Sequence, residues 1–152
     1  MKFIGLFLLC VFLSSCELSR DSGVWRGEVS VDDGYTFSEQ CQLEVEITRS
    51  SDTLILHSMN LGCPRYSYSW RVGAFDLFGG GIWKYGQRLG EVDPDGEVDL
   101  SLHSAVVDEP LPTAYRSIRL RWRRVGSELQ IWQESGGLGR PGTMKGWLRR
   151  KR

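Results

Sequence analysis

The strongest structural signal in the chain is a strict alternation of apolar and polar side chains. Between positions 40 and 48 every second residue is apolar, namely Cys41, Leu43, Val45 and Ile47. A period of two places these side chains on one face of a β-strand, whereas a helix would scatter the intervening charges around its circumference. The pattern predicts a sheet with one buried face and one face in water.

The same alternation recurs along most of the chain. It predicts further strands over 25–31, 54–59, 65–72, 82–85, 98–102, 115–125, around 129–131, and over 143–149. Glycine-rich and proline-bearing segments separate them, and 79–81 and 93–96 are the clearest turn signals. The 18 glycines and six tryptophans agree with many short strands joined by turns. We therefore expect a single all-β domain of about eight to ten strands.

Antiparallel strands without crossover helices must protect the edges of their sheet. An up-and-down barrel and a two-sheet β-sandwich both do so, and we favour the barrel. Gly23-Val24-Trp25 resembles the Gly-x-Trp motif of lipocalins and other calycins. The resemblance implies a calycin-like barrel in which Trp25 plugs the closed end against a basic residue near the last strand; the alternative is an ordinary core tryptophan. Three residues are candidates for that basic partner: Lys145, Arg149 and Arg150.

The N-terminus reads as a processing signal. Lys2 precedes an apolar run over 3–13, which has the length of a signal-peptide core and is too short to span a bilayer. The run ends in Leu13-Ser14-Ser15-Cys16, which resembles the lipobox of bacterial lipoproteins. The resemblance implies cleavage before Cys16, a diacylglycerol on its sulfur and acylation of its amine. The alternative is an ordinary secretory signal, which would release a soluble protein with an unpaired Cys16.

These features divide the chain into four parts. They are a lipoprotein signal peptide (1–15), a lipidated N-terminus and tether (16–22), a single β domain (23–149) and a basic tail (150–152). Two or three acyl chains hold a protein firmly in a membrane. Glu17 follows the cysteine at a position where the family's inner-membrane retention signal is typically Asp. The expected location is therefore the bacterial cell envelope, with the outer membrane favoured.

Two cysteines remain once Cys10 is removed with the signal and Cys16 carries lipid. In an oxidising compartment, Cys41 and Cys63 are expected to form a disulfide. A hairpin loop over 49–53 with Arg49 opposite Thr53 would place position 41 opposite position 61. Cys63 then lies two residues beyond, within reach of a small bulge. The alternative is a metal site, but the Cys-x-x-Cys spacing typical of zinc is missing, and we expect no metal.

The net charge is zero, but its two signs are separated along the chain. Residues 17–110 contain 17 acidic and 7 basic side chains, a difference of −10, and residues 111–152 contain 2 and 11, a difference of +9. Arg119, Arg121 and Arg123 fall on one wet face of a strand. Either neighbouring acidic strands neutralise them, or they form a patch for an anionic partner such as lipid headgroups or a cell-wall polymer. Nucleic acid is not expected in this compartment.

Enzyme chemistry has little support in the sequence. Asp99, Ser101 and His103 share one face of a strand, but successive positions lie about 7 Å apart, too far for a working triad. The carboxylates of Asp93, Asp95 and Asp99 could bind calcium, but Asp-Pro-Asp-Gly is more often only a turn. We expect no enzyme activity and no cofactor.

The resulting hypothesis is a lipid-anchored envelope lipoprotein with a structural or interaction role. The alternative is a lipocalin-like barrel that binds a small apolar ligand. Six aromatic side chains could line its cavity: Trp25, Tyr66, Tyr68, Trp70, Trp83 and Tyr85. An apolar cavity of about 300 Å³ or more would favour the ligand.

Overall fold

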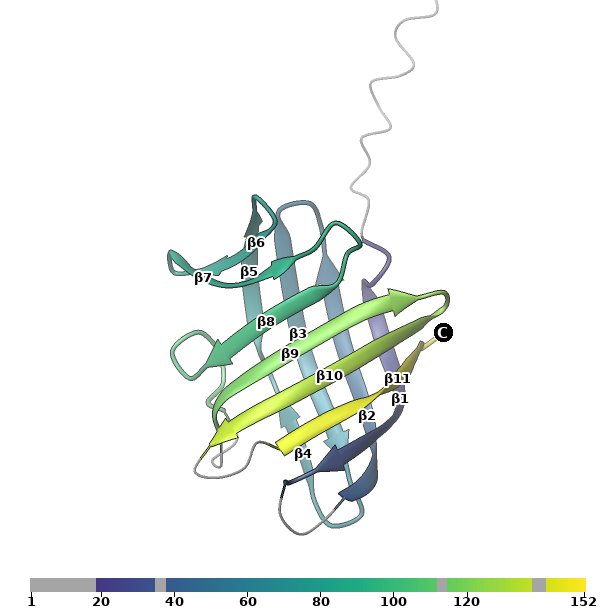
Figure 1. The fold of residues 1–152 in the computed structure, drawn as a ribbon. Helices are drawn as coiled ribbons and strands as arrows, with labels where there is room; N and C mark the ends of the chain where they lie inside the picture. The colour runs from purple at the N-terminus through teal and green to yellow at the C-terminus, as the bar shows by residue number, and fades with distance from the viewer. Residues whose placement is uncertain (1–18, 35–37, 112–114, 138–141) are drawn as a thin grey trace, which may run out of the picture.

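The computed structural model describes residues 19–34, 38–111, 115–137 and 142–152. Eleven strands occur in this part of the chain (Figure 1). They are β1 (Gly23–Asp32), β2 (Ser38–Arg49), β3 (Thr53–Gly62), β4 (Ser67–Trp70), β5 (Gly73–Phe78), β6 (Gly81–Lys84), β7 (Gln87–Val92), β8 (Val98–His103), β9 (Tyr115–Val125), β10 (Glu128–Gly137) and β11 (Gly142–Arg150).

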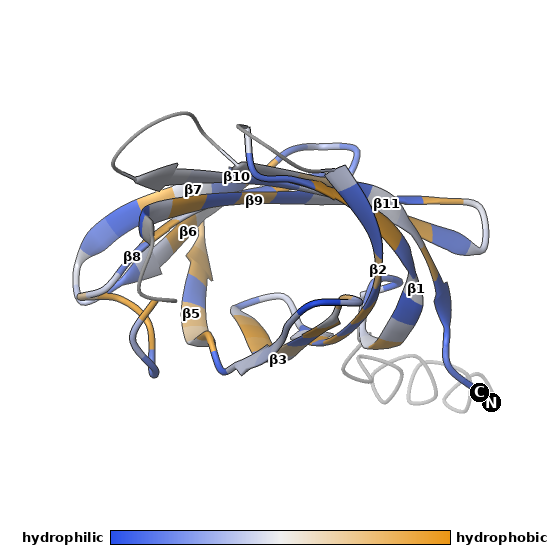
Figure 2. Cartoon of the chain, turned by 90° about the horizontal axis from the view of Figure 1, so that it is seen from below, coloured by the Kyte–Doolittle hydropathy of each residue, from blue (hydrophilic) through white to orange (hydrophobic). Residues whose placement is uncertain are grey.

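All of these strands belong to one antiparallel sheet that closes on itself. From β5 to β11 each strand pairs with the next along the chain, β11 pairs with β1, and the β1–β2, β2–β3 and β3–β5 pairs complete a ring of ten strands. The strands are not spread evenly around an axis, so the ring is flattened, with β9 and β10 on one side and β3 on the other (Figure 2). The structure confirms the antiparallel up-and-down barrel and not the two-sheet sandwich.

The segment predicted as one strand over 65–72 is shorter and is followed by a second strand. Strands β4 and β5 both pair with β3 in one continuous register, because Met59 faces Trp70 and Leu56 faces Gly73. The ladder is broken at positions 71 and 72, where the loop after β8 supplies the hydrogen bonds instead. The Arg71 amide donates to the Glu109 carboxylate (2.9 Å), and the Asp108 amide donates to the Val72 carbonyl (3.0 Å).

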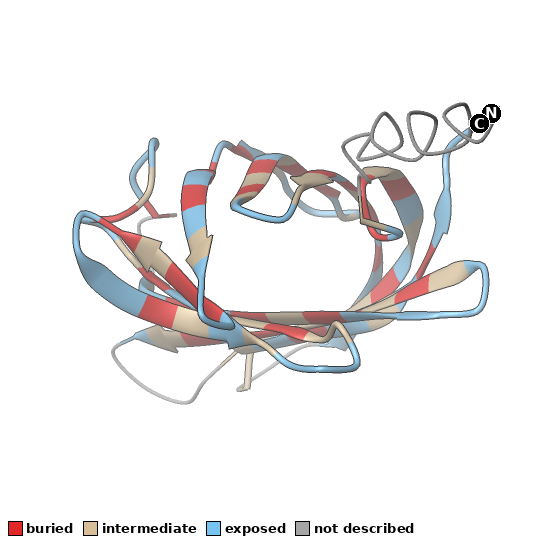
Figure 3. Ribbon diagram, turned by 90° about the horizontal axis from the view of Figure 1, so that it is seen from above, coloured by how far each residue is buried: buried red, intermediate tan, exposed pale blue. Residues whose placement is uncertain are grey.

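The inward-facing side chains pack into one hydrophobic cluster, and buried positions alternate with exposed ones along the strands (Figure 3). The alternation predicted for β2 and β9 is observed, since Leu43, Val45 and Ile47 are buried on one strand and Leu120 and Trp122 on the other. Burying a large apolar side chain stabilises the fold by about 1.5–3 kcal/mol. The apolar face of each strand therefore points into the barrel.

The predicted disulfide is present, and its register differs from the one expected. Cys41 and Cys63 are bonded, with their Cα atoms 4.4 Å apart. Arg49 faces Leu54 and not Thr53, and a bulge between Glu46 and Ile47 then shifts the pairing by one more residue. These two offsets together account for the two-residue gap, because they bring position 63 opposite position 41.

The predicted signal peptide (1–15) and Cys16 lie outside the described residues. Within the part of the chain that the structure describes, no helix is long and apolar enough to cross a membrane.

Candidate functional site

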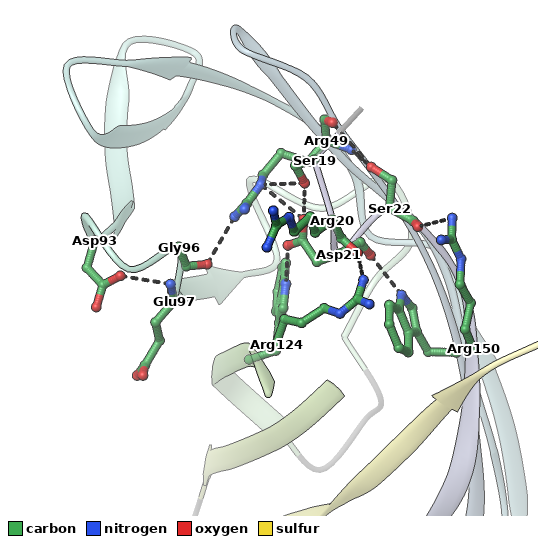
Figure 4. Close-up of polar contacts among 12 residues, drawn as sticks. Ser19, Arg20, Asp21, Ser22, Arg49, Asp93, Gly96, Glu97, Arg124 and Arg150 are labelled. Carbon is green, nitrogen blue, oxygen red and sulfur yellow. Dashed lines mark hydrogen bonds and ion pairs between the residues drawn. The ribbon is translucent and has the colours of Figure 1, made fainter. Parts of the chain in front are cut away.

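One end of the barrel is capped by Ser19–Ser22, which precede β1 (Figure 4). Asp21 lies at the centre of this cap and is only 2% exposed. Its carboxylate lies 3.2 Å from Nε of Arg49 on β2 and accepts a 2.9 Å hydrogen bond from the indole N–H of Trp122 on β9. The hydroxyl of Ser19 also donates to it. These contacts join strands from opposite sides of the ring, so the cap closes this end.

Trp25 lies inside the capped end, and a basic side chain covers it, although not one of those that the calycin resemblance implied. The indole N–H of Trp25 donates to the Asp21 carbonyl (2.7 Å), and the Arg124 guanidinium lies 5.4 Å from the centre of its ring. The basic partner is therefore on β9. None of the three candidates near the last strand takes this place, and Arg150 instead donates to the Ser22 carbonyl (2.8 Å).

The opposite end of the barrel, which we call the mouth, contains a pocket of about 250 Å³. Its lining combines apolar, aromatic and polar side chains from both sides of the ring: Val31, Asp32, Asp33, Leu61, Tyr66, Tyr68, Gln133, Ser135, Gly142, Thr143 and Met144. Gln133 is 5% exposed and faces inward on β10, where its amide nitrogen donates to the Ser135 hydroxyl (3.0 Å). Its amide oxygen is buried and has no hydrogen-bond partner.

Glu39 provides a second unsatisfied acceptor at the mouth. It lies on the inward face of β2, two positions before Cys41. One carboxylate oxygen lies 3.8 Å from Nε of Arg65, and the other is buried without a hydrogen-bond partner. Buried polar atoms are nearly always hydrogen-bonded, so two unsatisfied acceptors at one end of the barrel identify the mouth as a candidate binding site.

The six aromatic residues predicted to line a cavity do not come together. Tyr66 and Tyr68 line the mouth pocket, but Trp25 lies at the capped end. Trp70 is buried and donates its indole N–H to the Glu109 carbonyl (3.1 Å). The other two lie on or beside β6: Trp83 is half-buried, and Tyr85 is 81% exposed in the turn before β7. Of the six, Tyr66 and Tyr68 therefore share the mouth pocket, and the other four lie elsewhere.

The three arginines of β9 lie on the outer wall, as the alternation predicted. Arg119 makes two hydrogen bonds to the Asp99 carboxylate on β8, of 2.9 and 2.5 Å, and this contact raises the pKa of its guanidinium. Arg121 lies 3.7 Å from the Glu134 carboxylate on β10. Arg123 donates to the neutral amide of Gln130 (3.0 Å). Neutralisation by neighbouring strands therefore accounts for two of the three charges.

Two tryptophans on the same outer wall were missed in the sequence. Trp132 on β10 is half-buried, with the Arg121 and Arg123 guanidinium groups 5.8 and 5.4 Å from its ring. Trp147 on β11 is 45% exposed. Trp132 faces Lys145 and Gln130 faces Trp147, so the two rings are diagonal neighbours. The alternation around 129–131 contained the signal, because it places Trp132 on the wet face beside Gln130.

These tryptophans border a shallow groove of about 560 Å³ on the outer wall. The groove crosses β2, β1, β11 and β10, and its other side chains are polar or charged: Glu28, Ser30, Gln40, Gln130 and Lys145, with Gly146 beside them. No aliphatic side chain belongs to its lining. Indole rings next to hydrogen-bonding groups can stack against a flat ligand and bind its polar groups at once.

Two of the carboxylates that the sequence offered for catalysis or for calcium binding have hydrogen-bond partners within the chain. Asp99 is engaged by Arg119, and Asp93 accepts a 2.8 Å hydrogen bond from the Glu97 amide within its own turn. In the described residues, the acidic and sulfur ligands that come close enough to share one ion are those of Glu39, Cys41 and Cys63, and both sulfurs are already in the disulfide.

Comparison of the chain with protein-family models, with curated proteins and with solved structures found no match in any of the three.

Proposed function

We propose that the protein is a lipid-anchored lipoprotein of the bacterial envelope that binds a cell-wall polymer through its outer wall. The observation that carries this proposal is the groove that Trp132 and Trp147 help to line. Neighbouring exposed apolar side chains on a protein surface are typical of interaction sites. Tryptophan and arginine are also enriched among the residues that contribute most to binding energy. The rest of the outward face of these strands consists mainly of charged and polar side chains.

The chemistry of the groove suits a glycan. A sugar ring has an apolar C–H face that stacks on an indole ring, and its hydroxyls both donate and accept hydrogen bonds. Glu28 and Gln40 can accept those bonds, and Gln130 and Lys145 can donate them. Carboxylates carried by a cell-wall polymer would be attracted to Lys145 and Arg123. The core of a protein–protein interface is depleted of charged residues, whereas this lining includes Glu28 and Lys145.

The anchor follows from the lipobox resemblance together with the position of the cap. Ser19 is the first described residue and lies three positions after Cys16. Three extended residues span at most about 10 Å. A lipid on Cys16 would therefore hold the capped end next to the membrane and leave the outer wall and the mouth accessible to the envelope.

The groove is tested with the lipid-free protein by co-sedimentation with purified cell wall. Trp132→Ala/Trp147→Ala should weaken binding at least about tenfold, because each ring contributes about 1–3 kcal/mol of stacking in comparable aromatic sites. Phe78→Ala removes an aromatic side chain that is 80% exposed elsewhere and should bind like the wild type. Equal binding by the tryptophan variant and the wild type would contradict the proposal.

The arginines are tested in the same assay. Replacing Arg119, Arg121 and Arg123 with Gln should weaken binding to cell wall, and added salt should weaken binding by the wild type, as the Debye length falls from about 10 Å at 0.1 M to about 3 Å at 1 M. If the triple variant bound cell wall as well as the wild type at low salt, the arginines would have only a structural role. Preferential binding to anionic vesicles over cell wall would overturn the polymer in favour of a lipid surface.

The anchor is tested on Cys16. Cys16→Ala should abolish acylation and membrane fractionation, and mass spectrometry of the mature N-terminus of the wild type should show a lipid-modified cysteine. An unmodified N-terminal residue would contradict the anchor and support the secretory alternative.

A further inference from the structure

We infer that the mouth pocket binds a small molecule that presents a hydrogen-bond donor, an ammonium or a hydroxyl group, on an apolar or aromatic body. Gln133 is the residue that recognises the donor. The inference is independent of cell-wall binding, because the pocket lies inside the ring and the groove lies on the outer wall.

The side-chain amide of Gln133 lacks one hydrogen-bond partner among the described residues. It is 5% exposed, and one end of its amide already binds the Ser135 hydroxyl. The other end is buried and unsatisfied. If the amide oxygen and nitrogen were exchanged, the NH₂ group would be the unsatisfied end instead of the oxygen, since Ser135 can satisfy only one end.

The position of Gln133 on β10 is also unusual for a core. The preceding inward-facing residues of the strand, Leu129 and Ile131, are apolar and fully buried, but the strand then changes to Gln133 and Ser135 as it reaches the mouth. A barrel that needed only to fill its interior would continue with apolar side chains, because an unsatisfied buried amide destabilises the folded state. The change from apolar to polar inward-facing residues is explained if a ligand completes the hydrogen bonds of Gln133.

Glu39 provides a second buried acceptor at this end of the barrel, outside the lining of the pocket. The register Glu39, Val31, Met144, Gln133 forms one row across β2, β1, β11 and β10. Three strand spacings separate its ends, about 14 Å along the wall. Each end of the row carries a buried oxygen without a donor. Of the two residues, Gln133 lines the pocket, so its oxygen is the one that a ligand in the pocket can reach.

The walls of the pocket limit the body of the ligand. Val31, Leu61 and Met144 provide apolar surface, and Tyr66 and Tyr68 provide aromatic surface. A volume of about 250 Å³ accommodates a molecule with one ring. Asp32 and Asp33 also line the pocket, and their carboxylates favour an ammonium group and repel an anion. The expected class is a small aromatic or aliphatic amine or alcohol.

The test uses calorimetry and NMR with four probes that share a benzyl group: benzylamine, benzyl alcohol, toluene and phenylacetate. Benzylamine and benzyl alcohol should bind to the purified protein, should shift the side-chain amide resonances of Gln133, and should bind at least about tenfold more tightly than toluene or phenylacetate. Gln133→Met, which keeps the length of the side chain, should remove this preference. Gln42→Met, on the exposed face of β2, should retain it.

Stability provides the second measurement. If Gln133 serves a ligand, Gln133→Met should keep or raise the melting temperature of the ligand-free protein, since it removes an unsatisfied amide. A lower melting temperature with unchanged probe binding would show that Gln133 is structural and would overturn the inference. So would equal affinities for the four probes in the wild type, a result that depends on no variant. Failure of the cell-wall assay leaves these outcomes unaffected.

Discussion

Asp21 shows how one buried charge can hold a barrel end closed. Removing a carboxylate from water costs several kcal/mol, and the cost is offset only where the charge is paired and hydrogen-bonded. The contacts that satisfy Asp21 come from three parts of the chain: Ser19 in the cap, Arg49 on β2 and Trp122 on β9. Arg49 in turn donates to the Gly96 carbonyl (3.2 Å), which ties the β7–β8 turn to the cap.

We expect Asp21→Ala to lower the free energy of unfolding by about 3–5 kcal/mol, because it leaves the half-buried Arg49 guanidinium without its partner. Urea denaturation measures the change. Asp95→Ala, at an exposed turn, should stay within about 0.5 kcal/mol of the wild type. The double variant Asp21→Leu/Arg49→Met should lose less than the sum of the two single variants, and strict additivity would contradict a direct pair.

Period-two alternation predicted which side chains of a strand face inward and which face outward, but it could not predict which polar groups are paired. Asp21 and Trp122 are 101 positions apart, and nothing in the polar segment before β1 indicates that it folds back into the barrel. The same limit applies to Gln133, since its unsatisfied amide becomes visible only when the neighbours of β10 are known. Trp132 and Trp147 were predictable in position, and their pairing into one groove depends on the β10–β11 register.

At the scale of elements, the β2–β3 hairpin is fixed by its disulfide as well as by its ladder. The bond closes a loop between residues 22 positions apart, which removes about 3.4 kcal/mol of denatured-state entropy in the chain model. Cys41→Ala/Cys63→Ala should therefore lower stability by up to about 3 kcal/mol in urea unfolding. In protein taken from its native compartment, both thiols should resist alkylation until reduction. Free thiols in that sample would contradict the bond.

The seam between β1 and β11 depends on two glycines. A Cβ atom on Gly146 would collide with the Glu28 carbonyl and lie 2.7 Å from Cγ1 of Val29. A Cβ atom on Gly27 would collide with the Trp147 carbonyl. Glycine in a strand is typical of such close approaches between backbones.

We expect Gly146→Ala to lower the unfolding free energy by about 1–3 kcal/mol, the usual cost of overpacking, because backbone atoms must move to admit the methyl group. Gly62→Ala is the matched control, since nothing lies within 4 Å of its added methyl. Amide hydrogen exchange should show faster opening of the β1–β11 pair in Gly146→Ala only. Equal stability of the two variants would contradict a close seam.

Two strands, β5 and β7, were not predicted, and tertiary contacts explain both. Strand β5 follows a break in the β3 ladder that is created by the loop after β8, more than 30 residues away. Asp108 of that loop forms an ion pair with the buried Lys84 (3.2 Å) and lies against Gly73, where no side chain would fit. Strand β7 carries one fully buried residue, Leu89, so it shows almost no alternation.

At the scale of the whole molecule, ring closure brings the acidic and basic parts of the chain together. Because β1 pairs with β11 and β8 with β9, late basic residues lie beside early acidic ones. Lys151 bridges to Glu44 (3.1 Å) and Arg119 to Asp99 (2.5 Å). These two ion pairs join the basic part of the sequence to the acidic part, and Lys145 and Arg123 lie beside the tryptophan groove.

We expect the barrel to take one orientation on a membrane. The proposed anchor at Cys16 adjoins the cap, so the capped end should face the lipid and the mouth should point away from it. Strands of about ten residues tilted by about 40° give a height of about 25 Å, enough for a fluorophore to distinguish the two ends. A dye on Ser127→Cys, in the turn beside the cap, should be quenched by nitroxide-labelled headgroups. A dye on Ser67→Cys, at the mouth, should not be quenched.

The native disulfide occupies Cys41 and Cys63. With the proposed processing, Cys10 would be lost with the signal and Cys16 would carry the lipid, so the introduced cysteine would be the thiol available to the dye in each variant. With Cys16→Ala added, neither dye should be quenched, which shows that the contact depends on the anchor and not on the charged surface. Stronger quenching at Ser67 than at Ser127 would reverse the orientation and place the mouth pocket against the membrane. Equal quenching at both positions would mean that the link between Cys16 and Ser19 lets the barrel rotate freely, contrary to a cap held within about 10 Å of the lipid.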